Sequence, residues 1–394
     1  MIKMEDAYIV YYKRVPFSRA RPKDPEKDIY NDLKMDKLLS DLIRISIEET
    51  EINPSEIDDV ITGCALQAGE NWTYGGKHTA LLSELPVSVP AMSMDRACSS
   101  SLNATSIGSM EIMLNKAGIV LAGGMEHMTH VPLGIDDPYI KPNMELMVNP
   151  KYSKYNMNVS YNMGLTAEKL AALKHIPRDE MDKYSYNSHI RAAKAYDDGF
   201  MDDEIMPVTV NGKTIDRDVG IRKDVSLEAI ESLKPAFKEN GIITAGNSSS
   251  LNDGASLLML MSGSKVNEYG LKPVAKVVDF AAAGVDPTIM GEGPVPATEK
   301  VLKRNNLKAD DIDYWEINEA FAVVVLNAVK AFNLDLNKVN IHGGGISIGH
   351  PLGATGARLA GTLARTLDDR KKDLGIATLC VGGGQGYSML LERV

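Results

Sequence analysis

The architecture of this chain is set by Leu374-Gly375-Ile376-Ala377-Thr378-Leu379-Cys380-Val381-Gly382-Gly383-Gly384, a short apolar run that enters three glycines. A similar run occurs in the first half, Ala117-Gly118-Ile119-Val120-Leu121-Ala122-Gly123-Gly124. Each run predicts a buried strand that ends in a turn. The strands before them also match, since Glu56-Ile57-Asp58-Asp59-Val60 is similar to Asp311-Ile312-Asp313-Tyr314-Trp315. The sequence therefore predicts two copies of one α/β unit.

The rest of the chain alternates between helical and strand patterns, which is typical of layered α/β proteins. Apolar residues at helical spacing predict helices over 38–48, 101–115 and 355–367. Short apolar runs predict strands over 60–65, 87–94, 119–124, 312–317, 339–342 and 374–380. The predicted fold class is α/β.

A region of different character, roughly residues 123–245, separates the two copies. It begins with a stretch rich in Pro, Asn and Tyr over 128–162 and continues as a predicted helical segment over 163–200. Such an insertion can cover a ligand, and a structural appendage or oligomer contact is the alternative. We expect an N-terminal half over 1–122 and 245–270, a loop domain over 123–244, and a C-terminal half over 271–394.

Composition excludes several classes of protein. The 394 residues are 44% hydrophobic and 24% charged, with a formal net charge of -10. The negative balance argues against nucleic acid as a main partner. No apolar stretch approaches the roughly 20 residues that span a membrane. The first six residues lack the basic-then-apolar order of a secretory signal, so we expect a cytoplasmic protein.

The three cysteines, Cys64, Cys98 and Cys380, are too few and too scattered for a disulfide framework. They form no Cys-x-x-Cys pair, and their spacing with His350 lacks zinc-finger regularity, so we expect no metal site. Cys64 lies inside a predicted strand without capping serines, which favours a structural role.

Cys98 lies at the start of a predicted helix, in Arg96-Ala97-Cys98-Ser99-Ser100-Ser101. The positive end of the helix dipole stabilises a thiolate there. The serines can cap the helix and leave room for a substrate. A small buried hydrophobe is the alternative role for a free cysteine at this position.

Two further segments carry groups that can move protons. His350 follows a glycine-rich stretch and precedes Pro351, and its neutral imidazole can take the proton of Cys98. A phosphate loop is the alternative, but the glycines match neither Gly-x-Gly-x-x-Gly nor a Walker loop. Cys380 precedes three glycines whose backbone N–H groups can bind an oxyanion, with packing at a strand end as the alternative. Among the other histidines, His127 has the most suggestive context.

Together these segments resemble the thiolase family. Seven motifs occur in family order over nearly the whole chain: Cys98-Ser99-Ser100-Ser101-Leu102-Asn103-Ala104, Gly123-Gly124-Met125-Glu126-His127-Met128, Met163-Gly164-Leu165-Thr166-Ala167-Glu168, residues 244–255, Asn318-Glu319-Ala320-Phe321, Gly349-His350-Pro351-Leu352-Gly353 and residues 380–386. The resemblance implies a five-layer αβαβα thiolase fold, built from two similar halves with an inserted loop domain. It also implies ping-pong acyl transfer, with coenzyme A as co-substrate and no permanently bound cofactor.

The same resemblance implies a role for each matching residue. Cys98 would attack the 3-keto group of a 3-ketoacyl-CoA, His350 would activate it, and Cys380 would protonate the departing enolate of acetyl-CoA. His350 and a water held by Asn318 would form one oxyanion hole. The backbone N–H groups of Cys98 and Gly382 would form the other. Contacts with CoA would come from Ser249, Arg222 and Met163.

The motifs favour a degradative 3-ketoacyl-CoA thiolase of fatty-acid β-oxidation. Cys98-Ser99-Ser100-Ser101 resembles that group, and Asn162 replaces a histidine common in biosynthetic members. The alternative is a biosynthetic acetyl-CoA C-acetyltransferase with the same catalytic residues. Cys380 and Asn318 disfavour a decarboxylating ketoacyl synthase, and the intact cysteines and histidine disfavour a catalytically silent subunit. The resemblance also implies a homodimer or homotetramer, and a multifunctional β-oxidation subunit as partner.

Overall fold

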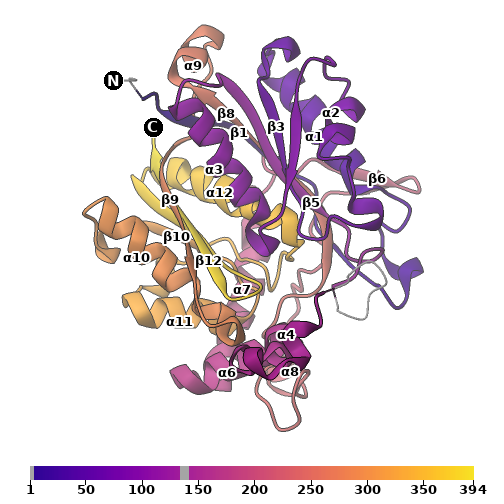
Figure 1. Ribbon diagram of the computed structural model, residues 1–394, viewed down its shortest axis with the longest axis vertical. Coiled ribbons are helices and arrows are strands. Elements are labelled where there is room, and N and C mark those ends of the chain that lie inside the picture. Colours follow the sequence, from indigo (N-terminus) through magenta and orange to yellow (C-terminus); the bar gives the residue numbers. More distant parts are fainter. Residues whose placement is uncertain (1–3, 134–141) are drawn as a thin grey trace.

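The structure, a computed structural model, describes residues 4–133 and 142–394. Its main sheet has ten hydrogen-bonded strands and consists of two similar portions (Figure 1). Strand β1 (Ala7–Arg14) joins the portions, because it pairs along its length with β8 and, through Ala7 to Ile9, with β9. Consequently, the two halves of the chain form one continuous unit.

The two portions of the sheet share one strand order, β1-β8-β5-β3 in the first and β9-β12-β11-β10 in the second, and β4 extends the first portion beyond β3. In the first, β3 is parallel to β5, and β5 is antiparallel to β8. In the second, β10 is parallel to β11, and β11 is antiparallel to β12. The strands, with β2 beside β8, are β2 (Ser18–Arg19), β3 (Asp59–Gly63), β4 (Ala91–Met94), β5 (Ile119–Glu126), β8 (Asn252–Ser262), β9 (Ala275–Gly284), β10 (Tyr314–Ile317), β11 (Leu374–Val381) and β12 (Gln385–Arg393).

Helices complete a five-layer αβαβα arrangement. The central layer holds α3 (Ser100–Met113) and α12 (Leu352–Arg370), which contact each other and strands of both portions. Both helices are buried over most of their length, as expected for helices between two sheets. The outer layers are α1 (Met35–Thr50), α2 (Lys77–Leu82) and α9 (Gly263–Tyr269) on one side, and α10 (Pro294–Arg304) and α11 (Ala322–Phe332) on the other.

One side-chain contact occurs at the same place in both halves and fixes how the parallel strands begin. Asp58, just before β3, accepts hydrogen bonds from the backbone N–H groups of Gly118 (2.6 Å) and Ile119 (3.1 Å) at the start of β5. Asp313, just before β10, accepts them from Asp373 (3.0 Å) and Leu374 (3.2 Å) at the start of β11. The repeat that the sequence predicts is therefore present in the hydrogen bonds as well as in the strand order.

The central helices approach each other closely because of one glycine. A Cβ atom on Gly356 of α12 would collide with the backbone N of Leu102 in α3. The hydroxyl of Ser101 accepts a hydrogen bond from the backbone N of Ala357 at 2.9 Å, which ties the two helices together. This contact brings the beginnings of α3 and α12, and therefore the segments around Cys98 and His350, into one region of the fold.

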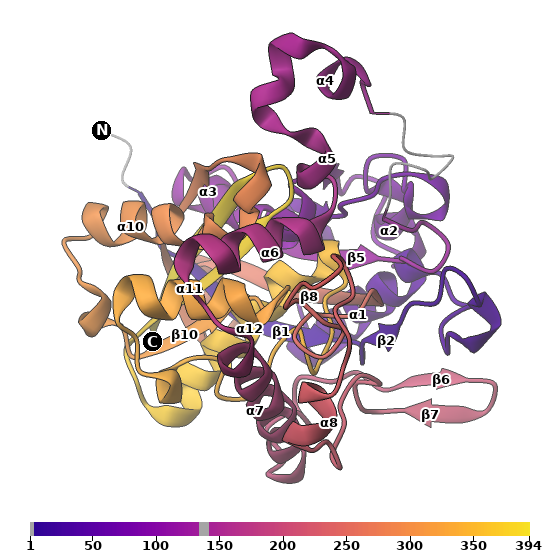
Figure 2. The same ribbon diagram turned by 90° about the horizontal axis from the view of Figure 1, so that it is seen from below.

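The inserted region adds several short elements to one end of the molecule. Helices α6 and α7 pack against α11, while α4 and the β6–β7 hairpin project outward on different sides (Figure 2). The elements are α4 (Glu145–Val148), α5 (Met157–Ser160), α6 (Met163–Lys174), α7 (Arg178–Asp197), β6 (Val208–Val210), β7 (Lys213–Ile215) and α8 (Leu227–Glu231). The remaining short 3-10 helices are η1 (Pro25–Lys27), η2 (Pro54–Glu56), η3 (Gly69–Asn71), η4 (Ala97–Ser99), η5 (Pro150–Tyr155), η6 (Pro287–Glu292), η7 (Ala309–Asp311) and η8 (Leu336–Lys338).

Three predicted elements differ in the structure. The strand predicted over 87–94 begins only at Ala91, because residues 86–89 form a turn. The helical segment predicted over 163–200 is two helices, since Pro177 cannot continue the first and His175 has a left-handed φ of 52°. The strand predicted over 339–342 is a single bridge from Val339 to Trp315. The helices predicted over 38–48, 101–115 and 355–367 are present as α1, α3 and α12. Each extends beyond its predicted ends, except that α3 ends at Met113.

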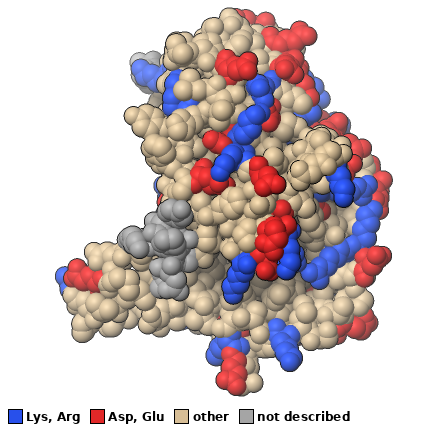
Figure 3. Space-filling model, turned by 90° about the vertical axis from the view of Figure 1, so that its right-hand side faces the viewer, with Lys and Arg blue, Asp and Glu red and all other residues tan. Residues whose placement is uncertain are grey.

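Among the described residues, no helix combines the length and apolarity that a membrane crossing requires. On the face drawn in Figure 3, acidic and basic side chains intermingle over the upper and right-hand parts. Neither sign of charge forms a broad continuous patch among the described residues of that face.

Candidate active site

Cys98 lies in the short helix η4, directly before α3, and only 8% of it is exposed. The preceding Ala97 has a left-handed φ of 43°, a conformation that is unusual for a residue with a side chain and is often found at functional sites. The backbone N–H groups of Gly382 and of Cys98 itself are near enough to the thiol sulfur to lower its pKa. The sulfur therefore lies beside two backbone donors.

The Cys98 thiol is protonated at rest. Burial raises its pKa to about 11, the two backbone donors lower it, and the carboxylates of Glu126 and Asp95 raise it further. The helix dipole led us to expect a stabilised thiolate, and that expectation is wrong for the resting site because desolvation outweighs the backbone donors. A base is needed to remove the proton when the thiol attacks.

Cys380 and Gly382 lie at the end of β11, opposite Cys98. Cys380 is fully buried, and burial, followed by the nearby Cys98, raises the pKa of its thiol. A Cβ atom on Gly382 would lie 3.9 Å from the Cβ of Ala97 and 3.9 Å from the sulfur of Met163. The end of β11 thus brings Cys380 and Gly382 close to Cys98, and Met163 at the start of α6 lies beside Gly382.

His350 lies between two polar partners that fix its tautomer. Its Nδ1 is 2.6 Å from the hydroxyl of Thr355, which itself donates to the carbonyl of Pro351, so Nδ1 carries the proton. The side-chain amide nitrogen of Asn318 lies 3.2 Å from Nε2 and 3.5 Å from Nδ1, so it sits beside the ring and not along the Nε2 lone pair. Burial, assisted by the charge of Arg358, lowers the pKa of His350 to about 3. The imidazole is therefore neutral and can accept a proton at Nε2.

The backbone around His350 is held by Asn252. The side-chain oxygen of Asn252 accepts from the backbone N of His350 at 2.9 Å. Gly349 has a φ of 118°, and a Cβ atom there would lie 2.7 Å from the Asn252 amide nitrogen, so only glycine fits. In the described residues His350 has no direct hydrogen bond to Cys98 or Cys380; its helix α12 packs against η4, which carries Cys98.

Asn318 and Glu319, which follow β10, have different surroundings. Asn318 is fully buried, and its side-chain oxygen has no hydrogen-bond partner among the described residues. Glu319 accepts hydrogen bonds from Tyr184 (2.7 Å), Ser188 (2.7 Å) and the backbone N of Ile346 (3.1 Å). Asn318 is therefore available to a reacting group, whereas Glu319 fastens the glycine-rich stretch before His350 to α7.

Sequence reasoning missed the importance of Glu126. This buried carboxylate at the end of β5 accepts from the backbone N of Gly353 (2.8 Å), in the first turn of α12, and from Ala65 (2.9 Å) and Leu66 (3.0 Å). The thiol of Cys64 also contacts it, at 3.5 Å, which supports a structural role for that cysteine. Burial raises the pKa of Glu126 to about 7. Only its place in Glu126-His127-Met128 could have signalled it.

His127, the histidine with the most suggestive context, lies in a buried acidic cluster. Its Nδ1 is 3.3 Å from Asp253 and its Nε2 is 3.4 Å from Glu70. Although burial opposes protonation, Asp253 and the other carboxylates raise the pKa of His127 above its ordinary value. Its ring stacks on His130 at 4.2 Å. These contacts place His127 among the carboxylates of a buried cluster.

A pocket of about 220 Å³ lies beside the predicted CoA residues. Arg222 and Arg19 line it, as do Ser248 and Ser250 on either side of Ser249. Burial, followed by the charges of Arg21 and Arg222, lowers the pKa of Arg19. Several positive charges therefore lie close together at this pocket. The backbone N of Ser249 donates to the carbonyl of Ala320 at 2.9 Å, which joins this pocket to the segment that carries Asn318.

Comparisons with known proteins show the family of the chain. The family described as "Thiolase, N-terminal domain" matches residues 8–264, and "Thiolase, C-terminal domain" matches residues 271–393. The chain is 39% identical to "3-ketoacyl-CoA thiolase" of Saccharophagus degradans, covering 100% of both chains. It is 39% identical to "Probable acetyl-CoA acyltransferase" of Staphylococcus aureus, covering 92% of this chain and 94% of that protein.

Solved structures give the same result. The Bacillus anthracis acetyl-CoA acetyltransferase superposes with a TM-score of 0.88 at 34% identity, over 100% of both chains. The human mitochondrial 3-ketoacyl-CoA thiolase in complex with CoA superposes with a TM-score of 0.89 at 32% identity, over 100% of this chain and 99% of that one. Fold, site and relatives define an acyltransferase enzyme. The chain belongs to the thiolase family, which confirms the predicted thiolase fold.

Proposed function

We propose that the enzyme cleaves 3-ketoacyl-CoA with CoA, giving acetyl-CoA and an acyl-CoA shortened by two carbons, through an acyl group on Cys98. The observation that carries the proposal is the position of the Cys98 sulfur, which lies near the Gly382 N–H group and near Cys380 at the end of β11. A relative over the full length of the chain has the name 3-ketoacyl-CoA thiolase, which favours this substrate class. The reaction is reversible and belongs to fatty-acid β-oxidation.

In the first half-reaction, His350 Nε2 takes the thiol proton as the Cys98 sulfur attacks the 3-keto carbon. The backbone N–H groups of Gly382 and Cys98 can then stabilise the resulting oxyanion. The bond between C2 and C3 breaks, its electron pair passes to the enolate of acetyl-CoA, and Cys380 gives that carbon a proton. His350 and a water held by the Asn318 side chain stabilise the enolate oxygen.

In the second half-reaction, a second CoA removes the acyl group from Cys98. The CoA sulfur bonds to the acyl carbon and the bond from that carbon to the Cys98 sulfur breaks; the CoA thiol proton restores Cys380, and the proton held by His350 returns to the Cys98 sulfur. We place the CoA chain along the pocket lined by Arg222, with Ser249 and Met163 on its way to Cys98. The two arginines there, Arg19 and Arg222, suit the phosphate groups of CoA.

Accordingly, CoA is a co-substrate, and we propose that no permanently bound cofactor or metal takes part. We further propose a cytoplasmic enzyme that forms a homodimer or homotetramer, with a multifunctional β-oxidation subunit as partner. The loop domain over 123–244 would cover the CoA pocket, since Arg222, which lines that pocket, falls within it. The halves over 1–122 with 245–270 and over 271–394 would supply the two portions of the sheet.

An assay of thiolysis with 3-ketoacyl-CoA substrates of increasing chain length tests the proposal. We expect acetyl-CoA and an acyl-CoA two carbons shorter, with turnover on substrates longer than acetoacetyl-CoA. A Cys98→Ala variant should give neither product. Absence of C2–C3 cleavage on every chain length, from protein whose fold is verified, would contradict the proposal.

A biosynthetic acetyl-CoA C-acetyltransferase is the second candidate. The similarity to the Bacillus anthracis acetyl-CoA acetyltransferase, at 34% identity over the full chain, favours it. The same assay separates the candidates, because an enzyme of that kind should act on acetoacetyl-CoA and lose activity sharply on longer substrates.

A further inference from the structure

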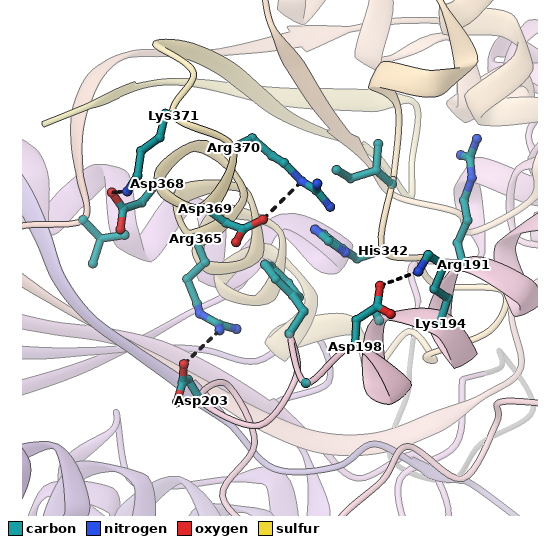
Figure 4. A pocket seen from close by; sticks show the side chains of 15 residues that line it. Arg191, Lys194, Asp198, Asp203, His342, Arg365, Asp368, Asp369, Arg370 and Lys371 are labelled. Atoms are coloured by element: carbon teal, nitrogen blue, oxygen red, sulfur yellow. Dashed lines mark hydrogen bonds and ion pairs between the residues drawn. The ribbon is translucent and has the colours of Figure 1, made fainter.

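A second cavity, of about 760 Å³, lies between the end of α7 and the end of α12 (Figure 4). No residue proposed above for catalysis or CoA contact lines it. Cavities of roughly 300–1,000 Å³ are typical of small-molecule sites. Its charged lining holds five cations and four carboxylates, an excess of one positive charge, and includes the imidazole of His342.

His342 is the buried polar group of this cavity. Only 5% of it is exposed, and its Nε2 has no hydrogen-bond partner among the described residues. Its ring is fixed against Phe200, with 3.6 Å between ring centroids. Burial lowers the pKa of His342 to about 4, so the ring is neutral and Nε2 can carry an N–H donor. A bound acceptor would give this buried donor the partner that the described residues do not supply.

The charges of the lining leave an excess of positive charge. All four lining carboxylates are paired with lining cations: Asp198 with Lys194 (2.6 Å), Asp203 with Arg365 (3.5 Å), Asp368 with Lys371 (3.0 Å) and Asp369 with Arg370 (3.1 Å). Arg191 differs, since it donates to the backbone carbonyls of Val339 (2.8 Å) and Leu336 (3.0 Å). Carbonyls do not neutralise a guanidinium, so the cavity favours an anion.

We propose that this cavity binds a small molecule carrying a phosphate group, whose oxygens accept from His342 Nε2 and face Arg191 and Arg370. Figure 4 shows His342 between Arg370 of α12 and the Lys194–Asp198 pair of α7, so cations from both helices surround it. Ala195, Val274 and Ile341 supply apolar lining for the organic part of the ligand. Phe200 is already covered by His342 and by Arg365 at 4.5 Å, so recognition depends on the phosphate and not on ring stacking there.

Isothermal titration calorimetry of the full chain, with inorganic phosphate and separately with AMP, tests the proposal. We expect both probes to bind, with AMP tighter if the organic part contributes. His342→Phe and Arg191→Met should each weaken binding about tenfold or more. His342→Gln, which keeps an N–H donor, should retain more affinity than His342→Phe. Arg304→Met, a substitution of a partly exposed arginine bound to Asp279, is the matched control and should bind normally.

The CoA pocket also carries arginines, so the titration needs a second arm. Arg222→Met should leave phosphate binding unchanged, and saturating CoA should not displace the phosphate. Thermal unfolding of every variant verifies that it folds. The proposal is overturned if neither probe binds to the wild-type protein. It is equally overturned if Arg222→Met removes binding while correctly folded Arg191→Met and His342→Phe retain it in full.

Discussion

The two halves of this enzyme use one scaffold for different purposes. Asp58 and Asp313 bind the start of the neighbouring strand through the same pair of backbone N–H groups. The strands that they hold, β5 and β11, end differently. At the end of β5, Glu126 fastens the first turn of α12, whereas at the end of β11, Cys380 and Gly382 face Cys98. The two halves therefore share the scaffold and differ in the side chains at the ends of equivalent strands.

The largest expected effect is the difference in turnover between substitution of Cys98 and substitution of Cys64, the two buried cysteines of the first half. Cys98→Ala should reduce both cleavage and synthesis by on the order of 10⁴-fold or more, because no acyl-enzyme can form. Cys64→Ala is the matched control, and it should keep turnover within a few-fold while losing stability, since Cys64 only packs against Glu126. Steady-state assays in both directions measure this. Substantial turnover by the Cys98 variant would contradict the assignment of the nucleophile.

The next prediction concerns the cysteine of the second half. Cys380→Ser should slow overall turnover by about 10²–10⁴-fold, because proton transfer to and from carbon is impaired. Acylation of Cys98 by an acyl-CoA, followed by rapid quench, should be affected much less. Equal losses in both measurements would mean that Cys380 does not act separately from Cys98.

A smaller effect concerns the protonation states of Cys98 and His350, which lie just before α3 and α12. The pKa of Cys98 is raised to about 11, so its thiolate fraction should increase roughly tenfold per pH unit up to that value. The pKa of His350 is lowered to about 3, so it stays neutral at every pH above that and adds no inflection near neutrality. The rate of iodoacetamide inactivation, measured against pH with protection by acyl-CoA as control, should therefore rise without a plateau near neutral pH. A plateau there would show a thiolate stabilised at rest.

The smallest effect tests whether the scaffold of the two halves is equivalent. Asp58→Ala and Asp313→Ala should each lower the free energy of unfolding by about 1–2 kcal/mol, with little change in turnover, because each removes two hydrogen bonds from backbone donors. Asp310→Ala, at an exposed position near Asp313, should change it by less than about 0.5 kcal/mol. Urea unfolding measures all three. A large loss at only one of the two aspartates would break the equivalence.

Much of the scaffold could be predicted because its signals are local. The apolar run at 119–124 and that at 374–380 became β5 and β11, and the glycines after Cys380 made the predicted turn. Local signals also misled, since Val87 and its neighbours alternate like a strand while forming a turn before Pro90. His175 and Pro177 ended a helix that apolar spacing alone would continue.

The candidate site was harder to predict, because its contacts join distant segments. Residue identity in the motifs indicated Cys98, His350 and Cys380, but the contact of Glu126 with Gly353 links a strand end to a helix start far along the chain. The raised pKa of Cys98 was also unpredictable, since it depends on how completely the folded chain removes water from the sulfur. Such quantities follow from burial, which a single sequence does not display.

The central claim, that Cys98 and not Cys380 carries the acyl group, can be tested by one measurement. The protein is incubated with an acyl-CoA in the absence of free CoA, quenched in acid, digested and analysed by mass spectrometry. The account predicts the acyl mass on the peptide containing Cys98 and on neither of the peptides containing Cys64 or Cys380. An acyl group on Cys380, or an unmodified Cys98 in active protein, would contradict it.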